Sequence, residues 1–298
     1  MLSEKIKFII NPNAGFRRNK RYLYDLIRRR CKGLDFKIVH THGPGDATRM
    51  AQQAANEGYA KVVAVGGDGT INETASGLVG TETALGIIPR GSGNGLARSL
   101  NIPLQAAKAL EVIGTGKIYR IDAGRAAHRY FFVVTGVGFD ASVGSKFNSA
   151  SWRGPLPYFY LAAREFANYQ PEPLRLRLEH EVMEIMPFLV TIANTQQYGN
   201  GAIIAPHARP DDGILEVCVV NPMTFAEFAL YAPKLFNGKA DTIPLITYYR
   251  SKFAAIEKSG PVLFHVDGEA QTAESPVEIS VLPQALKVIV PASYAAPS

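Results

Sequence analysis

The chain has 298 residues, a length that suggests two domains at roughly 150 residues per domain. Hydrophobic residues make up 47% of the chain and charged residues 19%, which excludes an intrinsically disordered protein. The net charge of +6 is concentrated between Arg17 and Lys32, where eight basic residues accompany one acid. This uneven distribution disfavours a nucleic-acid binder with basic residues over its whole surface.

The sequence predicts neither a membrane span nor a secreted protein. Its apolar runs are far shorter than the ~20 residues that a membrane-spanning helix needs. Glu4, Lys5 and Lys7 interrupt the hydrophobic core that a secretory signal requires. Two cysteines, Cys31 and Cys218, cannot supply a disulfide framework. We therefore expect a cytoplasmic protein.

Strand and helix patterns alternate along the first 120 residues. Short apolar runs separated by single helical stretches predict a parallel sheet with helices on both faces, which is a doubly wound α/β domain. The expected strands and helices, in chain order, are Lys5–Ile10, Asn19–Lys32, Leu34–His40, Asp46–Glu57, Lys61–Val65, a helix through Leu78, and Ala84–Ile88.

The pattern changes after Tyr119, where strand signals become dense and helical stretches are few. A β-rich second domain, such as a β-sandwich, is expected here. The expected strands are Tyr130–Thr135, Leu174–His180, Pro187–Ala193, Ile214–Val220, Leu245–Arg250, Val262–Val266 and Val277–Val281, with helices near Tyr158–Tyr169 and Thr224–Phe236. A boundary near Ile121–Gly124 gives domains of residues 1–122 and 123–284. The sequence leaves open whether Ala285–Val290, and with it residues 285–298, returns to the first domain.

Three glycine-rich turns, Asn11–Gly15, Gly66–Thr70 and Gly91–Gly95, each follow a strand of the predicted parallel sheet. Ligands of such sheets bind beyond the carboxyl ends of the strands, so the three turns should converge. Glycine lets the backbone approach a ligand closely, and the last two turns also open helices, whose N-termini favour phosphate. Any one of these turns alone is equally well explained as a simple tight turn. Together they predict a site for nucleotide phosphates.

Asp68 lies between glycines in the second of these turns. It has three readings: a cap of the turn, a ligand of Mg²⁺, or a contact to the acceptor hydroxyl group. Its position beside the predicted phosphates favours a functional role.

Other signatures of catalysis are absent from the sequence or ambiguous. No Gly-x₄-Gly-Lys-Ser/Thr motif occurs, and Gly136–Ala141 is interpreted as a structural bend. Asp267-Gly268 on its own favours the turn of a β-hairpin.

The motifs Asn11–Gly15, Gly66–Glu73 and Pro89–Asn94 resemble those of the diacylglycerol kinase catalytic-domain family, which includes bacterial soluble lipid kinases and is related to sphingosine and ceramide kinases. Further matches in the same order are Ile121–Arg125, Gly136–Ala141, Asp211–Gly213 and His265–Glu269. The resemblance covers nearly the whole chain. The Gly-Gly-Asp-Gly element alone is shared with NAD kinases, whereas the ordered set is specific.

The resemblance implies an N-terminal domain that binds ATP, similar to those of NAD kinase and phosphofructokinase, and a C-terminal β-sandwich that binds a lipid substrate. The residues expected to contact ATP lie in the glycine-rich turns and near them. They are Asn11, Pro12, Asn13, Ala14, Gly15, Thr41, Gly66, Gly67, Asp68, Gly69, Thr70, Asn72, Glu73, Gly91, Ser92, Gly93 and Asn94.

The resemblance also implies acids and metal ligands. Asp68 and Asp122 match acids associated with the active-site Mg²⁺, and Asp267 and Glu269 match acids to which the general-base role is assigned. With the family match, we expect Val262–Glu269 to stay extended, so that both acids share one face. A second, structural Mg²⁺ site matches Asp212 and the carbonyl groups of Arg209 and Ile214. The catalytic candidates are therefore Asp68, Asp267 and Glu269.

The implied reaction transfers the γ-phosphate of ATP to a primary hydroxyl group of a lipid. Gly91–Ala97 is closer to the sphingosine- and ceramide-kinase branch than to bacterial diacylglycerol kinases, so both lipid classes stay open. The alternatives are an NAD kinase-like phosphotransferase and a catalytically silent regulator. Peripheral membrane contact is expected from Arg17–Lys32 or Ser151–Tyr160, although a solvated helix face and core packing explain these segments as well. A homodimer is left open, and no nucleic-acid partner is expected.

Overall fold

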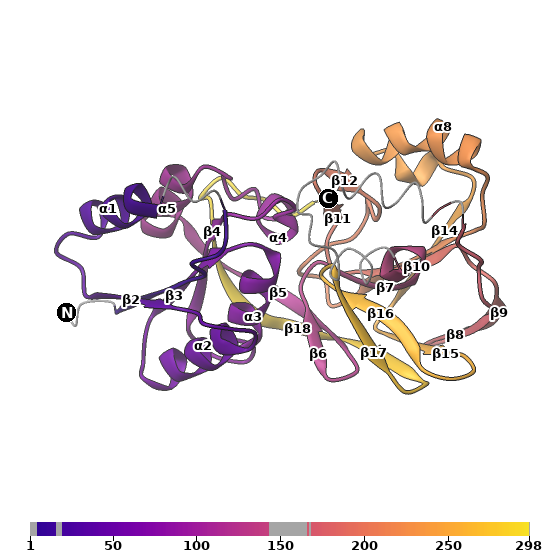
Figure 1. Ribbon diagram of the computed structural model, residues 1–298, viewed down its shortest axis with the longest axis horizontal. Coiled ribbons are helices and arrows are strands. Elements are labelled where there is room, and N and C mark those ends of the chain that lie inside the picture. The colour runs from indigo at the N-terminus through magenta and orange to yellow at the C-terminus, as the bar shows by residue number, and fades with distance from the viewer. Residues whose placement is uncertain (1–4, 16–19, 143–165, 167, 298) are drawn as a thin grey trace. The chain divides into compact units, whose positions relative to one another are not determined.

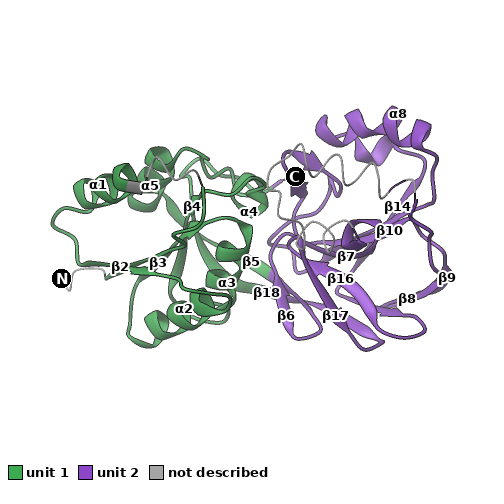
Figure 2. Cartoon of the chain, viewed as in Figure 1, with its two compact units in different colours: residues 1–122, 284–296 green, residues 123–283, 297–298 purple. Residues whose placement is uncertain are grey.

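The computed structural model describes residues 5–15, 20–142, 166 and 168–297. The chain forms two compact units, shown in different colours in Figure 2. Unit 1 comprises Met1–Asp122 and Gln284–Ala296, and unit 2 comprises Ala123–Pro283 and Pro297–Ser298. The chain passes from unit 1 to unit 2 within strand β5 (Lys117–Ala126) and returns within strand β18 (Val277–Val290).

Unit 1 is built on a parallel sheet with the strand order β2-β1-β3-β4. The strands are β1 (Ile6–Ile10), β2 (Phe36–His40), β3 (Lys61–Gly66) and β4 (Ala84–Pro89). The end of β18 adds to this sheet in parallel, with Val288 opposite Leu85. All residues of β1 and β4 are buried, as expected for central strands covered on both faces.

Five helices connect and cover these strands: α1 (Lys20–Arg30), α2 (Asp46–Asn56), α3 (Asp68–Ser76), α4 (Gly95–Ser99) and α5 (Ala106–Thr115). In Figure 1, α1 and α5 lie on one face of the sheet and α2 and α3 on the other. The predicted doubly wound α/β fold is confirmed for unit 1. Because its strands are parallel, the loops that follow β1, β3 and β4 leave the same edge of the sheet.

Unit 2 is the predicted β-sandwich. One antiparallel sheet has the strand order β14-β13-β10-β7-β16-β17. Its strands are β7 (Val134–Gly138), β10 (Leu189–Ala193), β13 (Leu215–Val220), β14 (Ile246–Ser251), β16 (Val262–Val266) and β17 (Glu269–Ala273). The other sheet contains β8 (Leu174–Leu178), β9 (Val182–Ile185) and β15 (Phe253–Glu257), and β15 pairs with the first residues of β18.

The core of unit 2 lies between these two sheets. Leu176 and Ile256 from one sheet pack in the same buried cluster as Ile192, Val217 and Phe264 from the other. The remaining elements of unit 2 are β6 (Arg129–Phe131), which pairs with β5, the small β11 (Gln197–Gly199) and β12 (Ala202–Ile203), helix α8 (Phe225–Phe236) and the 3₁₀ turn η2 (Ala240–Thr242).

Three predicted strands differ from the structure. The single strand expected at Tyr130–Thr135 is two strands, β6 and β7, because the chain leaves the sheet at Phe132 and Val133. The two strands expected at Val277–Val281 and Ala285–Val290 are one, β18. The helix expected near Tyr158–Tyr169 falls almost entirely outside the described residues. In the part of the chain that is described, no helix is long and apolar enough to span a membrane.

Candidate functional site

The three glycine-rich loops of unit 1 contact one another at the carboxyl end of the sheet. The Asn11 side-chain amide, directly after β1, donates to the hydroxyl group of Thr70 at 3.1 Å. Gly67, directly after β3, lies against Gly91 in the loop that follows β4, because a methyl group added at Gly91 would be 2.8 Å from the Gly67 Cα atom. The structure therefore brings the first loop to the second and the second to the third.

Close backbone packing explains why glycine is required in the third loop. At Gly91 the nearest neighbour is backbone, which cannot rotate away as a side chain can. At Gly93 a methyl group would be 3.0 Å from Oδ2 of Asp68. Neither glycine has a positive φ, so the requirement here is space and not backbone conformation. The second and third loops therefore pack backbone to backbone at Gly67 and Gly91.

Asp68 holds the third loop against the second. Its Oδ1 atom accepts the N–H of Gly95 at 2.7 Å, and Oδ2 accepts the N–H of Asn94 at 2.9 Å. Asn94 in turn closes its own loop, because its amide accepts from the N–H of Gly91 at 2.9 Å and donates to the carbonyl of Gly91 at 2.8 Å. Asp68 thus joins the second loop to the start of α4, a contact that the sequence motif alone did not indicate.

The first loop is closed by Asn11 and bordered by a basic side chain. Asn11 Oδ1 accepts the N–H of Asn13 at 2.8 Å, and Asn13 is itself exposed. A methyl group at Gly15, where φ is +74°, would be 2.8 Å from an Nη atom of Arg90, so this guanidinium lies beside the loop. Sequence reasoning did not single out Arg90, although it lies within the quoted motif Pro89–Asn94. A guanidinium beside a glycine-rich loop is suited to a phosphate group.

Glu73, expected to contact ATP, makes two side-chain contacts within unit 1. Its carboxylate accepts the N–H groups of Gly45 at 2.9 Å and Ala47 at 3.1 Å, at the start of α2. Carboxylates stabilise the N-terminus of a helix in this way. Thr41 lies just before this turn, buried, and its N–H donates to the Ile10 carbonyl at 3.1 Å. Glu73 therefore joins α3 to the loop that follows β2.

The remaining expected ATP contacts can be placed by loop. Ser92 is exposed at the tip of the third loop, whereas Asn72 lies one turn into α3 and accepts from the Ser76 hydroxyl group at 3.4 Å. The loops that the structure brings into contact contain Asn11, Pro12, Asn13, Ala14, Gly15, Gly66, Gly67, Asp68, Gly69, Thr70, Gly91, Ser92, Gly93 and Asn94.

The two acids that match the active-site Mg²⁺, Asp68 and Asp122, differ in how well they suit a metal ion. Asp68 is partly exposed, and two N–H bonds leave a carboxylate further lone pairs, so it suits a site in which phosphate oxygens and waters supply the other ligands. Asp122 is completely buried in β5, where Oδ1 accepts the N–H of Gln284 at 2.7 Å. The residues that the structure describes contain no group of three or more His, Cys, Asp or Glu side chains suited to a metal ion.

The expected second metal site does not fit the observed contacts. The Asp212 carboxylate accepts the N–H of Ile214 at 3.1 Å and is bound by the guanidinium of Arg250. Arg209 pairs with Asp211 at 3.3 Å. A guanidinium therefore already neutralises the charge that would attract a cation, and we derive no role for a metal at Arg209, Asp212 and Ile214.

The expectation that Asp267 and Glu269 lie on one face of an extended strand is wrong. Val266 pairs with Glu269 across the β16–β17 hairpin, and Asp267-Gly268 forms its two-residue turn. Both turn residues have positive φ, +47° at Asp267 and +86° at Gly268, as in a type I′ turn. The Asp-Gly signal, considered without the family, had indicated this hairpin.

The turn separates the two acids into different environments. The Asp267 carboxylate accepts three backbone N–H groups, those of Phe132 at 3.0 Å, Val133 at 2.9 Å and Val134 at 3.1 Å. Glu269 has a half-exposed side chain that faces Arg129 at 3.7 Å. Asp267 anchors the hairpin to the segment between β6 and β7, whereas Glu269 stands at the surface of unit 2.

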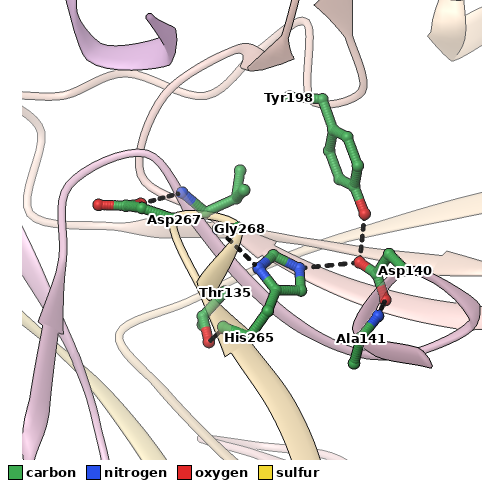
Figure 3. A network of polar contacts seen from close by, with 8 residues as sticks. Thr135, Asp140, Ala141, Tyr198, His265, Asp267 and Gly268 are labelled. Atoms are coloured by element: carbon green, nitrogen blue, oxygen red, sulfur yellow. Dashed lines mark hydrogen bonds and ion pairs between the residues drawn. The ribbon is translucent and has the colours of Figure 1, made fainter. Parts of the chain in front are cut away.

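A buried polar cluster next to this hairpin was not predicted from the sequence. Asp140, Tyr198 and His265 meet beside the Asp267-Gly268 turn, as Figure 3 shows. His265 and Asp140 are 4% and 9% exposed. Gly136–Ala141, interpreted as a bend, contributes Asp140, and Gly138, the last residue of β7, has φ +103°. The His265–Glu269 motif was the available signal, although it does not indicate the distant partners.

Comparisons with known proteins agree with this architecture. Residues 5–126 match the model of the diacylglycerol kinase catalytic domain, and residues 133–290 match that of the YegS C-terminal NAD kinase beta sandwich-like domain. The diacylglycerol kinase of Mycobacterium tuberculosis is 29% identical over 96% of this chain and 95% of its own length. A Chromohalobacter salexigens protein named "Probable lipid kinase YegS-like" is 31% identical over 83% and 81%.

Solved structures show the same fold. A crystal structure from Bacillus anthracis str. Sterne, described as a "putative diacylglycerol kinase", has a TM-score of 0.82 and 25% identity, and it covers 99% of this chain and 98% of the other.

Proposed function

The chain belongs to the diacylglycerol kinase family and is a lipid kinase, and we propose that it transfers the γ-phosphoryl group of ATP to a primary hydroxyl group of a lipid. The observation that carries this proposal is the contact among the three glycine-rich loops of unit 1. Diacylglycerol and lipids of the sphingoid-base or ceramide type are the two acceptor classes that the sequence motifs leave open.

We assign the phosphates of ATP to the loops Asn11–Gly15, Gly66–Thr70 and Gly91–Asn94. Two features support this assignment. Glycines keep side chains away from the backbone N–H groups, and the Arg90 guanidinium beside Gly15 adds a positive charge. Asp68 serves the site first by fixing the third loop through Asn94 and Gly95. It would also be the carboxylate that holds Mg²⁺, which when bound to the nucleotide neutralises charge on the phosphates.

Phosphoryl transfer depends mainly on alignment and on charge stabilisation. The hydroxyl oxygen of the lipid forms a bond to the γ-phosphorus atom, the bond from that phosphorus to the ADP oxygen breaks, and ADP leaves. The hydroxyl proton must pass to a base. General-base assistance of this kind typically accelerates a reaction by ~10²–10⁴-fold.

Of the two acids at the hairpin tip, we assign the proton acceptor to Glu269. Asp267 already accepts three backbone N–H groups, which occupy three of its roughly four acceptor sites and hold it in place. Glu269 is half exposed, and its carboxylate lies 3.7 Å from the Arg129 guanidinium. Glu269→Gln should therefore abolish most of the turnover and leave folding intact, whereas substitutions of Asp267 should act first on stability.

Membrane contact is a further part of this proposal. In the described part of the Arg17–Lys32 segment, Arg28, Arg29 and Arg30 are exposed in the last turn of α1. Arg17, Arg18 and the Ser151–Tyr160 segment lie outside the described residues. Each basic residue near an anionic surface contributes about 1 kcal/mol, or roughly fivefold in affinity. The affinity of Arg28→Gln/Arg29→Gln for anionic vesicles, measured by co-sedimentation, should therefore be about 25-fold lower than that of the wild type. Vesicle binding that salt does not weaken would contradict this contact.

Transfer of labelled phosphate tests the proposal directly. Purified protein receives γ-labelled ATP with diacylglycerol, phosphatidylglycerol, a sphingoid base, ceramide or NAD, and the product is identified after extraction. Label should appear in one of the lipids and be lost with Glu269→Gln, whereas Glu274→Gln, which changes an exposed acid after β17, serves as the matched control. Label in NAD would favour the NAD kinase alternative, and no transfer to any acceptor would favour the silent regulator.

A further inference from the structure

His265 occupies the centre of the buried cluster in unit 2. It lies in β16, two residues before the turn, and its Nε2 atom is 2.9 Å from Oδ2 of Asp140. Tyr198 donates its hydroxyl hydrogen to the same carboxylate oxygen. On the other side of the imidazole ring, the N–H of Gly268 points to Nδ1 at 3.3 Å (Figure 3). The ring therefore links a buried acid to the tip of the hairpin.

The hydrogen-bond partners assign the tautomer of His265. A backbone N–H can only donate, so Nδ1 must accept from Gly268 and carries no hydrogen. The single hydrogen of the neutral ring is then on Nε2, where it is donated to Asp140. Asp140 is itself fixed, because Oδ1 accepts the N–H of Ala141 at 2.7 Å. The acid thus selects the ring form that can receive the Gly268 N–H.

The position of Gly268 gives this contact its significance. Gly268 is bonded directly to Glu269, and both turn residues have positive φ, so small changes in the turn move the carboxylate that follows. The contact of Asp267 with Phe132, Val133 and Val134 fixes the other side of the turn. On the Gly268 side, the turn is held by the hydrogen bond from the Gly268 N–H to His265. Polar groups are costly to bury, so the buried pair of Asp140 and His265 beside one turn indicates a role beyond packing.

We propose that His265, oriented by Asp140, is a positioning residue that fixes the hairpin tip carrying Glu269. The proposal rests on the assignment of Glu269 as the proton acceptor in the lipid kinase reaction. His265 is 4% exposed and acts through the turn without contacting the substrate. A displacement of about 1 Å at a reacting group can cost on the order of 100-fold in rate, so a loss of turnover between about 10- and 100-fold is expected when the Gly268 contact is removed.

Two substitutions separate the two sides of the ring. Asparagine places an oxygen near the position of Nδ1, where it can accept from Gly268, but it does not reach Asp140. Glutamine places a nitrogen near the position of Nε2, where it can donate to Asp140, but it offers no acceptor at the Nδ1 position. If His265 positions the tip, His265→Gln should lower kcat by about 10- to 100-fold with an unchanged KM for ATP. His265→Asn should stay within about threefold of the wild-type kcat.

Two further measurements make the test decisive. Amide hydrogen exchange at Gly268 should be slow in the wild type and in His265→Asn and faster in His265→Gln. In a Glu269→Gln background, His265→Gln should lower the residual rate no further, because both changes act on the same group.

Equal kcat values for the two His265 variants, or equal exchange at Gly268, would overturn the positioning role. The exchange measurement does not depend on turnover. If the wild type transferred no phosphate to any lipid, the proposed function would fail, while the Gly268 contact would still be tested.

Discussion

Replacing Asp267 should lower the free energy of unfolding of unit 2, because this acid anchors the β16–β17 hairpin. Its carboxylate receives the N–H groups of Phe132, Val133 and Val134, which are 0%, 5% and 2% exposed. In Asp267→Ala these three donors lose their acceptor in a place that water scarcely reaches. Each buried donor left without a partner costs about 1–3 kcal/mol, so the three together cost about 3–9 kcal/mol.

Asp267→Asn provides the graded comparison. If the amide oxygen takes the place of Oδ1, it still accepts from Val133 and Val134, and only the N–H of Phe132 faces a donor. The expected cost is then that of one donor, about 1–3 kcal/mol. Asparagine also tolerates the φ of +47° at this position, so the backbone adds little to the loss.

Urea denaturation followed by circular dichroism measures both variants. Domains of this size are stable by about 5–15 kcal/mol, so Asp267→Ala should lose a large part of its unfolding free energy and Asp267→Asn a smaller part. Glu274→Ala, an exposed acid after β17, is the matched control and should lie within about 0.5 kcal/mol of the wild type. If Asp267→Ala had the wild-type unfolding free energy but no turnover, the anchoring role would be wrong and Asp267 would be the better candidate for the base.

Two further predictions address unit 1 and the pH dependence of unit 2. Gly91→Ala should weaken ATP binding at least tenfold, because its methyl group would lie 2.8 Å from the Gly67 Cα atom. Gly114→Ala, which has open space in α5, should bind ATP normally and gain about 0.5–1 kcal/mol of stability. Calorimetry of both variants measures the ATP affinity, and normal affinity in Gly91→Ala would refute the close packing of the loops. Glu216 is 3% exposed, and burial raises the pKa of its carboxyl group above the ordinary value of 4.5. Between pH 4.5 and the raised pKa, the folded state holds more protons at this site than the unfolded state. The wild type therefore loses stability as pH rises through this range, and Glu216→Gln should gain stability relative to it. A stability difference that does not change with pH in urea denaturation would contradict this.

Local patterns were sufficient for the first four strands of unit 1 and for the loops that follow them. Each of these strands is encoded by neighbouring residues, and parallel strands necessarily bring their carboxyl ends to one edge. The end of β18, which adds to this sheet, is joined to it by a distant contact and was left open by the sequence. The sequence could not show which groups the polar side chains would contact. Asp68 bonds to residues 26 and 27 positions away, and Glu73 to residues 26 and 28 positions away.

Unit 2 depends more on contacts between distant residues. His265 is 125 residues from Asp140, and no local pattern connects them. The sequence predicts Val277–Val281 and Ala285–Val290 as separate strands, yet β18 is continuous, because its first residues pair with β15 and Val288 pairs with β4. At Asp267-Gly268 the local hairpin signal was correct, and the expectation of an extended strand, drawn from the family motif, was not.

The measurement that tests the central claim most directly is amide hydrogen exchange of the whole chain with and without ATP. If the three loops bind the phosphates, ATP should slow exchange in Asn11–Gly15, Gly66–Thr70 and Gly91–Asn94, and adenosine, which lacks phosphates, should not. Slowed exchange elsewhere with no change in these loops, or an equal effect of adenosine, would contradict the assignment of the nucleotide site.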